Sequence, residues 1–183
     1  FLGRILVVDL TNRRLETAEF DDELAHRYLA GRGINSYRLF AELPEAAAPL
    51  GPETLLLLSG GLLTGTEAPA SSRLHVSARS PLTGLLGSSN VGGYFGAELR
   101  GAGLQGIAVR GQSESPVWLC VSGDRAELID ATDLWGCDAW ETQEILPRRL
   151  GGEGARVVGI GPGGGARGRD GCSGAGGMTG TWY

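Results

Sequence analysis

The sequence contains no lysine, and it is poor in the features that mark several functional classes. All sixteen basic residues are arginine, and the formal net charge is −5. Binding of nucleic acid or of an anionic membrane needs a concentrated positive patch, which this charge balance disfavours. The sequence also lacks an apolar run long enough to span a membrane and a charged segment followed by an apolar one at its start. We therefore expect no nucleic-acid partner, no membrane association and a cytoplasmic location.

Side chains that could bind a metal are also scarce. Cysteine occurs only at Cys120, Cys137 and Cys172, without a CxxC pair, and the two histidines, His26 and His75, lie far apart in the sequence. An iron–sulfur cluster held by one chain needs about four suitably spaced thiolates. We therefore expect no metal centre built only from these side chains. Cys120 lies in the apolar segment VWLCV, which predicts a position in the core.

Length and composition predict one folded domain followed by a tail. A chain of 183 residues can bury a single hydrophobic core, and 32 glycines indicate many turns. Residues 163–183, GGGARGRDGCSGAGGMTGTWY, contain nine glycines and almost no apolar side chains before Trp182. We expect a domain over 1–162 and a disordered tail over 163–183. Because the chain opens on Phe1 and not on methionine, we also expect a fragment of a longer protein.

Hydrophobic patterning predicts an α+β domain. Short apolar runs typical of strands occur at 4–10, 15–20, 54–59, 106–110, 116–122, 125–129 and 156–160. Helical spacing recurs over 22–43, interrupted at Gly31, and over 93–100 and 138–150. Pro147 is expected to bend or shorten the last of these helices. The expected core consists of the apolar strand residues Leu6, Val8, Leu56, Leu58, Val76, Ile107, Val109, Val117, Leu119 and Val157.

The stretch from Arg73 to Leu99 is the strongest candidate for a binding site. It reads as a strand, a glycine-rich loop and the start of a helix, with Asn90, Gly92 and Gly93 just before that helix. Such a loop directs free backbone N–H groups outward, and the helix dipole behind them favours phosphate or another anion. Arg73 adds a planar fork of donors suited to phosphate. The alternative is a tight turn beside a solvated arginine, since glycine-rich turns before helices are common.

A second glycine pattern lies near the end of the predicted domain. Gly159, Gly161 and Gly164 satisfy G-x-G-x-x-G directly after a predicted strand, as a dinucleotide-binding turn would. No helical pattern follows, and no further βαβ unit remains in the chain. The lack of a following helix and of further βαβ units therefore disfavours a dinucleotide site.

Eight segments taken together resemble one known family. They are, in chain order, GRILVVDLT, LAGRGI, SGGLLTGTEAP, SSRLHVSARSPLTG, SSNVGGYFGAELRGAG, GIAVRG, DATDLWG and VVGIGP. The same segments occur in this order in the aldehyde:ferredoxin oxidoreductases. From Gly3 to Pro162 the chain looks like the N-terminal domain of that family, and the central segments are long enough to be specific.

The resemblance implies both a fold and a function. In that family the N-terminal domain is an α+β unit of two β-sheets in a closed, barrel-like arrangement, and it forms the base for a bis-pterin cofactor. The implied enzyme contains tungsten or molybdenum, two pterins, magnesium and a nearby [4Fe-4S] cluster. It oxidises aldehydes to carboxylic acids and passes the electrons to ferredoxin. The resemblance is also compatible with a homodimer.

The resemblance also implies roles for residues of the central stretch. Arg73 takes the place of the arginine that bridges pterin and cluster. Asn90 takes the place of the residue whose backbone carbonyl helps to hold magnesium between the pterin phosphates. Val91, Gly92 and Gly93 complete the cradle for the cofactor. No catalytic residue and no cluster ligand is expected in this chain.

The segment after Pro162 departs from the family pattern. Family members continue there with an acidic turn and a second glycine-rich cofactor loop containing arginine, whereas this chain keeps only scattered glycine and arginine. We therefore expect the chain by itself to be incomplete and inactive, with the remaining domains on a longer chain or on a partner subunit. The alternative is a non-catalytic domain that binds pterin phosphate or only supports a partner chain.

Overall fold

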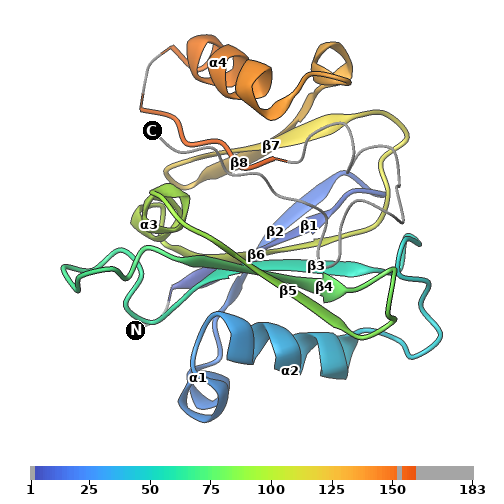
Figure 1. Cartoon of the computed structure of the whole chain (residues 1–183), viewed down its shortest axis with the longest axis vertical. Helices are drawn as coiled ribbons and strands as arrows, with labels where there is room; N and C mark the ends of the chain where they lie inside the picture. The colour runs from blue at the N-terminus through green and yellow to red at the C-terminus, as the bar shows by residue number, and fades with distance from the viewer. Residues whose placement is uncertain (1–2, 152–153, 160–183) are drawn as a thin grey trace.

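The computed structural model describes residues 3–151 and 154–159, which form two β-sheets and four α-helices (Figure 1). This arrangement confirms the predicted α+β class. The helices are α1 (Asp22–Tyr28), α2 (Arg32–Glu42), α3 (Phe95–Gly101) and α4 (Ala139–Arg149), with a 3-10 turn, η1, at Thr132–Leu134. The strands are β1 (Arg4–Asp9), β2 (Arg14–Glu19), β3 (Leu55–Gly60), β4 (Leu74–Arg79), β5 (Leu86–Val91), β6 (Leu104–Arg110), β7 (Val117–Ser122) and β8 (Arg125–Asp130).

The larger sheet is open at both edges. Its six strands lie in the order β2-β1-β6-β3-β4-β5, and every neighbouring pair is antiparallel except β1 with β6. Strands β7 and β8 form a separate two-stranded hairpin. The predicted closed, barrel-like arrangement is therefore wrong for the described residues, because β2 and β5 end the sheet and are not paired with each other. Strand β2 is mostly exposed and carries charged side chains, as is typical of a solvated edge.

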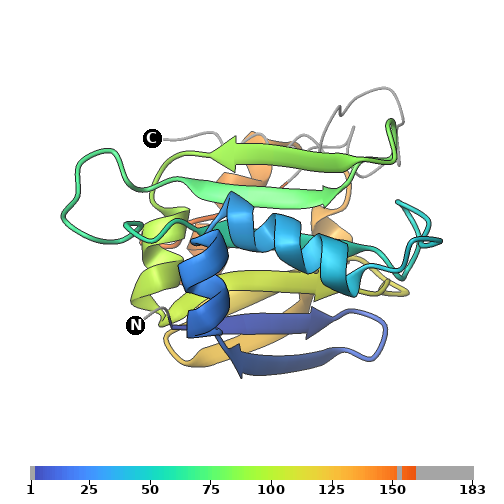
Figure 2. The ribbon, with the colours of Figure 1, turned by 90° about the horizontal axis from the view of Figure 1, so that it is seen from below.

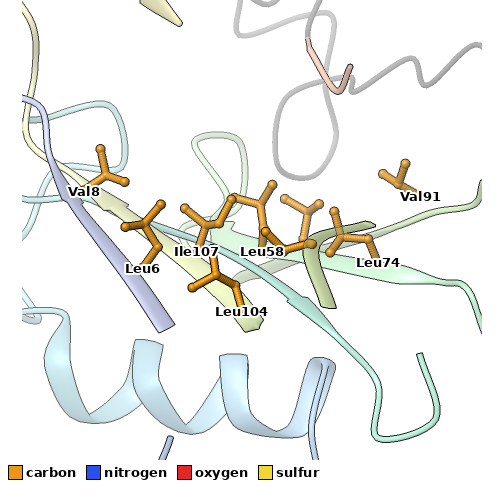
Figure 3. Close-up of a cluster of buried hydrophobic side chains, with 9 residues drawn as sticks. Leu6, Val8, Leu58, Leu74, Val91, Leu104 and Ile107 are labelled. Atoms are coloured by element: carbon orange, nitrogen blue, oxygen red, sulfur yellow. The ribbon is translucent and has the colours of Figure 1, made fainter. Parts of the chain in front are cut away.

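The main core lies between the larger sheet and the β7–β8 hairpin. Figure 3 shows its buried cluster, which consists of Leu6, Val8, Leu58, Leu74, Val76, Val91, Leu99, Leu104 and Ile107. Hairpin side chains, among them Leu119 and Leu128, pack against this cluster. The structure confirms as buried the predicted core residues Leu6, Val8, Leu58, Val76 and Ile107. The other predicted core residues are only half-buried: Leu56, Val109, Val117, Leu119 and Val157.

Helices α1 and α2 cover the opposite face of the sheet, and Figure 2 shows α2 lying over the sheet, with its axis roughly along the strands. The carboxylate of Asp21 caps α1 by accepting hydrogen bonds from the backbone N–H groups of Glu23 (2.8 Å) and Leu24 (3.2 Å). Leu39 of α2 shares a buried cluster with Leu57 of β3 and neighbouring side chains. The sheet is therefore covered on both faces, by helices on one side and by the hairpin with α3 on the other.

Three local features differ from the predictions. Residues 86–91, predicted as part of a glycine-rich loop, form β5 because pairing with β4 overrides the low strand propensity of Gly, Ser and Asn. Residues 156–159, predicted as a strand, have no regular structure, although Val157 packs against a cluster formed by α4 and η1. Pro147 does not shorten α4, which continues to Arg149.

Some predictions fall on residues that the structure does not describe. The predicted tail, 163–183, lies outside the described residues, as do Cys172 and two glycines of the G-x-G-x-x-G pattern, Gly161 and Gly164. Within the described ranges, we find no helix with the length and apolar character that a membrane crossing requires.

Candidate functional site

The hairpin of β4 and β5 brings Arg73 next to the predicted glycine pair. Leu74 is paired with Val91, so Arg73 and Gly92 are the next residues at the open end of the hairpin. A Cβ atom added at Gly92 would lie 3.8 Å from both Cζ and Nη1 of Arg73. The guanidinium group therefore lies at van der Waals distance from the position that a Cβ atom would take at Gly92. Residues that the sequence places far from one another thus meet at one end of the sheet.

The predicted cradle is the end of a strand, and only its last part is a loop. Asn90 and Val91 belong to β5, and the side chain of Val91 is buried in the main core, so Val91 can offer only its main chain to a ligand. Gly93 has a φ of 87°, a conformation that an L side chain rarely adopts. The following helix, α3, has only seven residues. The donors at this site therefore come from the hairpin and its loop, and the dipole of a long helix does not add to them.

Thr64 anchors the loop that leads to Arg73. Its side chain is 1% exposed, and Oγ1 lies 2.9 Å from the carbonyl oxygen of Ser71 and 3.3 Å from that of Arg73. A Cβ atom at Gly96 of α3 would approach Cγ2 of Thr64 to 3.2 Å, so the helix packs closely on this loop. The backbone of Arg73 is therefore held in place, while its side chain is exposed. Nothing in the sequence distinguishes Thr64 from the other small residues of this loop.

His75 is a second buried polar residue of this hairpin that sequence reasoning missed as part of the site. It is 8% exposed and faces Asn90 across the β4–β5 pairing. Its Nδ1 lies 2.6 Å from Oδ1 of Asn90, and its Nε2 lies 2.7 Å from Oγ of Ser88. In the sequence, His75 stands out only as an isolated histidine that lacks further metal ligands nearby. The register of the hairpin gives it a hydrogen-bonding role.

Asn35 of α2 connects the helix to the polar side chains of the sheet. It is 2% exposed, and its Nδ2 lies within 3.3 Å of the carbonyl oxygen of His75 and of Oγ of Ser77. Oγ of Ser59 donates to its Oδ1 at 2.8 Å. A buried amide needs such partners because an unsatisfied donor or acceptor is costly. The contacts hold α2 against β3 and β4 at the level of His75.

The groups with clearly shifted pKa values lie on other elements. Hydrogen bonds from the backbone and side chain of Asn12 lower the pKa of Asp9 at the β1–β2 turn. A hydrogen-bonded ion pair with Arg149 of α4 lowers the pKa of Asp133. Burial raises the pKa of the Cys120 thiol on β7. These shifts report contacts of the scaffold, so the case for the hairpin site depends on its geometry.

The fold and the hairpin define the class of this protein: an α+β domain whose edge hairpin gathers an arginine, an amide and two glycines. The family model described as "Aldehyde ferredoxin oxidoreductase, N-terminal domain" matches residues 5–175, which extends beyond the boundary predicted at Pro162. The chain belongs to this family.

Curated relatives agree with this assignment. The tungsten-containing aldehyde ferredoxin oxidoreductase of Thermococcus kodakarensis is 42% identical over 162 residues, which cover 88% of this chain and 27% of the relative. The enzyme of the same name from Pyrococcus furiosus is 40% identical over 162 residues, which again cover 88% of this chain and 27% of the relative. The "Aliphatic sulfonate oxidoreductase, WOR-like subunit" of Pyrococcus furiosus is 36% identical over 151 residues, which cover 81% of this chain and 24% of that protein. The chain therefore spans about a quarter of the length of these relatives.

A solved structure shows the same fold. The active site complex BamBC of benzoyl coenzyme A reductase, in complex with 1,5-dienoyl-CoA, contains a chain with a TM-score of 0.87 and 39% identity. The match covers 89% of this chain and 25% of that chain. The fold described above therefore also occurs as about a quarter of a chain in that solved complex.

Proposed function

We propose that this chain supplies the N-terminal part of the cofactor site of a tungsten- or molybdenum-pterin oxidoreductase. The observation that carries the proposal is the position of the Arg73 guanidinium, which lies beside Gly92 at the open end of the β4–β5 hairpin, 3.8 Å from where a Cβ atom would be. A guanidinium group and the backbone of adjacent glycines are donors that suit phosphate. The relatives named as tungsten-containing enzymes support the identity of the cofactor.

The residues present fit a group that bears phosphates. Gly92 has no Cβ atom, which leaves the space beside the Arg73 guanidinium free of a side chain. Gly93 adopts the positive φ of a loop that can turn main-chain groups toward a ligand. Asn90 is exposed at the edge of the sheet, so a ligand can reach it from solvent. A guanidinium group, a side-chain amide and glycine main-chain groups are thus gathered at one end of the β4–β5 hairpin.

Each residue has a defined role in the proposed site. Arg73 would bind the pterin on the side of the [4Fe-4S] cluster, and Gly92 and Gly93, with the main chain of Val91, would hold the phosphates. The backbone carbonyl of Asn90 would be a ligand of the magnesium ion between those phosphates. When bound, the metal-pterin group supplies the two-electron redox chemistry. The catalytic residues and the ligands of the cluster lie outside this chain.

The proposed overall reaction is the oxidation of an aldehyde. An aldehyde and water yield a carboxylic acid, two protons and two electrons, and the electrons leave through the [4Fe-4S] cluster to ferredoxin. The rest of the enzyme chain or a partner subunit completes the site, and a homodimer is the proposed assembly.

The benzoyl coenzyme A reductase complex supports a second candidate for the substrate, beside an aldehyde. The chain of the benzoyl coenzyme A reductase complex is 39% identical to this chain, close to the values for the aldehyde enzymes. A reaction on a coenzyme A thioester would use the same cofactor base, because the residues proposed here contact the cofactor and not the substrate. The residues proposed here do not distinguish the two candidates.

The proposal is tested by cofactor content. The domain is produced as part of a family-length polypeptide in cells that make the pterin cofactor, and tungsten, molybdenum and pterin are measured per folded chain. Arg73→Lys keeps the charge but loses the planar fork, and we expect cofactor affinity to fall about tenfold. Arg125→Lys, at an exposed position of β8, is the matched control. Equal cofactor content in the wild type and in Arg73→Lys would contradict the role of Arg73.

Measurements of activity separate the proposed enzyme from a non-catalytic domain that only binds pterin phosphate or supports a partner chain. Aldehyde-dependent reduction of ferredoxin by the loaded polypeptide supports the aldehyde reaction, and activity only with a coenzyme A thioester supports the second candidate. A loaded polypeptide that turns over neither class of substrate would indicate a non-catalytic domain.

A further inference from the structure

A row of polar side chains crosses the sheet and ends at the proposed cofactor site. Ser59 of β3 is paired with His75 of β4, and His75 is paired with Asn90 of β5. Ser59 and His75 are buried, whereas Asn90 at the edge of the sheet is exposed. The row therefore leads from beneath α2 to a residue that a ligand can reach.

The orientation of the Asn90 amide assigns a tautomer to His75. The Oδ1 atom of Asn90, 2.6 Å from Nδ1, can only accept a hydrogen bond, so Nδ1 carries a proton. In the neutral ring Nε2 is then an acceptor, and it receives the hydroxyl proton of Ser88 at 2.7 Å. Both ring nitrogens are thus satisfied by neighbours on β5.

This contact also orients the amide of Asn90. With Oδ1 turned to His75, the two N–H donors of Nδ2 extend from the other side of the amide group. In the described part of the chain, no acceptor is assigned to these donors, and Asn90 is exposed. They are therefore available to a ligand that accepts hydrogen bonds at the end of β5.

Helix α2 holds His75 in place from beneath. Nδ2 of Asn35 donates to the carbonyl oxygen of His75 at 3.3 Å, and Oγ of Ser59 donates to Oδ1 of Asn35 at 2.8 Å. Because Asn35 and His75 are both buried, neither can exchange these partners freely for water. The main chain of His75 is thus held by α2, and its imidazole ring by the side chains of Asn90 and Ser88 on β5.

We propose that His75 is a positioning residue for the cofactor site, and that it directs the Nδ2 donors of Asn90 to the phosphates. The inference rests on the proposed function, and it adds a side-chain contact to the main-chain contact already assigned to Asn90. His75 itself does not touch the cofactor in this scheme. Its effect on binding passes entirely through Asn90.

The tautomer is tested directly on the 183-residue chain. Long-range proton–nitrogen correlations in a sample labelled with ¹⁵N-histidine report which ring nitrogen carries the proton. The chain has only two histidines, and the exposed His26 of α1 is an internal reference. We expect the proton of neutral His75 on Nδ1. A proton on Nε2 would overturn the inference, because His75 could then not donate to Asn90.

Binding is tested with magnesium pyrophosphate, which presents two adjacent phosphates and a metal ion. The titration is followed by the amide signals of Gly92 and Gly93. We expect His75→Ala to weaken binding about tenfold, the loss of about 1.4 kcal/mol. His75→Asn, which keeps a nitrogen near the place of Nδ1, should restore most of the affinity. His75→Gln, with a nitrogen near the place of Nε2, should not.

Two further variants complete the test. His26→Ala is the control for loss of a histidine and should bind as the wild type does. The double variant His75→Ala/Asn90→Ala should bind no more weakly than Asn90→Ala alone, since His75 acts through Asn90. Additive losses, or rescue by His75→Gln and not by His75→Asn, would overturn the inference.

The outcomes distinguish this inference from the proposed function. If the wild type does not bind magnesium pyrophosphate, the phosphate site itself fails, and the role of His75 fails with it. If the wild type binds and folded His75→Ala binds equally well, only the positioning role is refuted. Circular dichroism of each variant confirms that the compared chains are folded.

Discussion

Alanine substitution at the two adjacent glycines should separate backbone strain from ligand contact. Gly93 has a φ of 87°, and an L residue in such a conformation costs about 1–2 kcal/mol. Gly92 does not have a positive φ, and a Cβ there would lie at an ordinary contact distance of 3.8 Å from Arg73. We therefore expect Gly93→Ala to lower the free energy of unfolding by about 1–2 kcal/mol, and Gly92→Ala to change it by less than about 0.5 kcal/mol.

The effects on binding should follow a different order. A methyl group at Gly92 occupies the space between the backbone and the guanidinium group, where a phosphate would have to approach. Gly92→Ala should therefore weaken the binding of magnesium pyrophosphate while the fold keeps its stability. Gly92→Val, with a larger side chain, should weaken it further. Asn90→Ala should be milder than either valine variant, Gly92→Val or Gly93→Val, because it removes one amide and leaves the backbone accessible.

Denaturant unfolding and thermal unfolding measure the stability effect. For a domain of this size, 1 kcal/mol corresponds to about 2–4 °C in Tm. Gly84→Ala is a matched control, because Gly84 has a φ of 70° with open space around its Cβ position and lies in the turn at the other end of the same hairpin. It should lose stability as Gly93→Ala does, without a loss of binding. A larger loss of stability for Gly92→Ala than for Gly93→Ala would refute the reasoning.

Three further predictions concern the scaffold. Asn35→Ala should lower the free energy of unfolding by about 2–3 kcal/mol, measured by denaturant titration, because it leaves buried polar partners unsatisfied; an unchanged midpoint would contradict the buried network. Gly106→Ala should cost about 1–3 kcal/mol in the same assay, since its Cβ would lie 2.5 Å from the carbonyl oxygen of Leu58; a neutral effect would mean that the strands separate easily. Burial raises the pKa of Cys120, so at a given pH its thiolate fraction is smaller than that of an ordinary thiol. Peptide mapping after iodoacetamide treatment should show slower alkylation at Cys120 than at the half-buried Cys137, with the rate rising only at higher pH; equal rates would argue against burial.

Local sequence patterns determined most of the elements of this fold. The β1–β2 hairpin, the two helices on either side of Gly31 and the buried strand β3 follow from apolar spacing and turn residues, which act over a few neighbouring positions. Strand β5 could not be predicted in this way, because Gly87, Ser88 and Ser89 have low strand propensity. Its conformation comes from hydrogen bonds to β4, which only the folded sheet supplies.

Only the tertiary structure showed that the larger sheet is open and which strands are neighbours in it. A resemblance to a family implied a closed, barrel-like arrangement, whereas the described strands form an open sheet with β2 and β5 at its edges. Apolar alternation indicates which residues of a strand face a core, but it does not state which strands are neighbours. The pairing of β1 with β6, which are far apart in the sequence, depends on long-range packing.

In the candidate site, too, some residues could be predicted from the sequence and others only from tertiary contacts. The chemistry of arginine, asparagine and glycine, together with the motifs of the family, was enough to predict Arg73 and the segment from Asn90 to Gly93, and their ligand stays a prediction. His75 was not predicted as part of the site, although side chains alternate along β4 and Leu74 and Val76 face the main core, which places His75 on the opposite face. That face would be solvated in an isolated hairpin. Only the packing of α2 buries it, and only the register of β5 places the Asn90 amide against the imidazole ring, because both contacts join segments that the sequence holds apart.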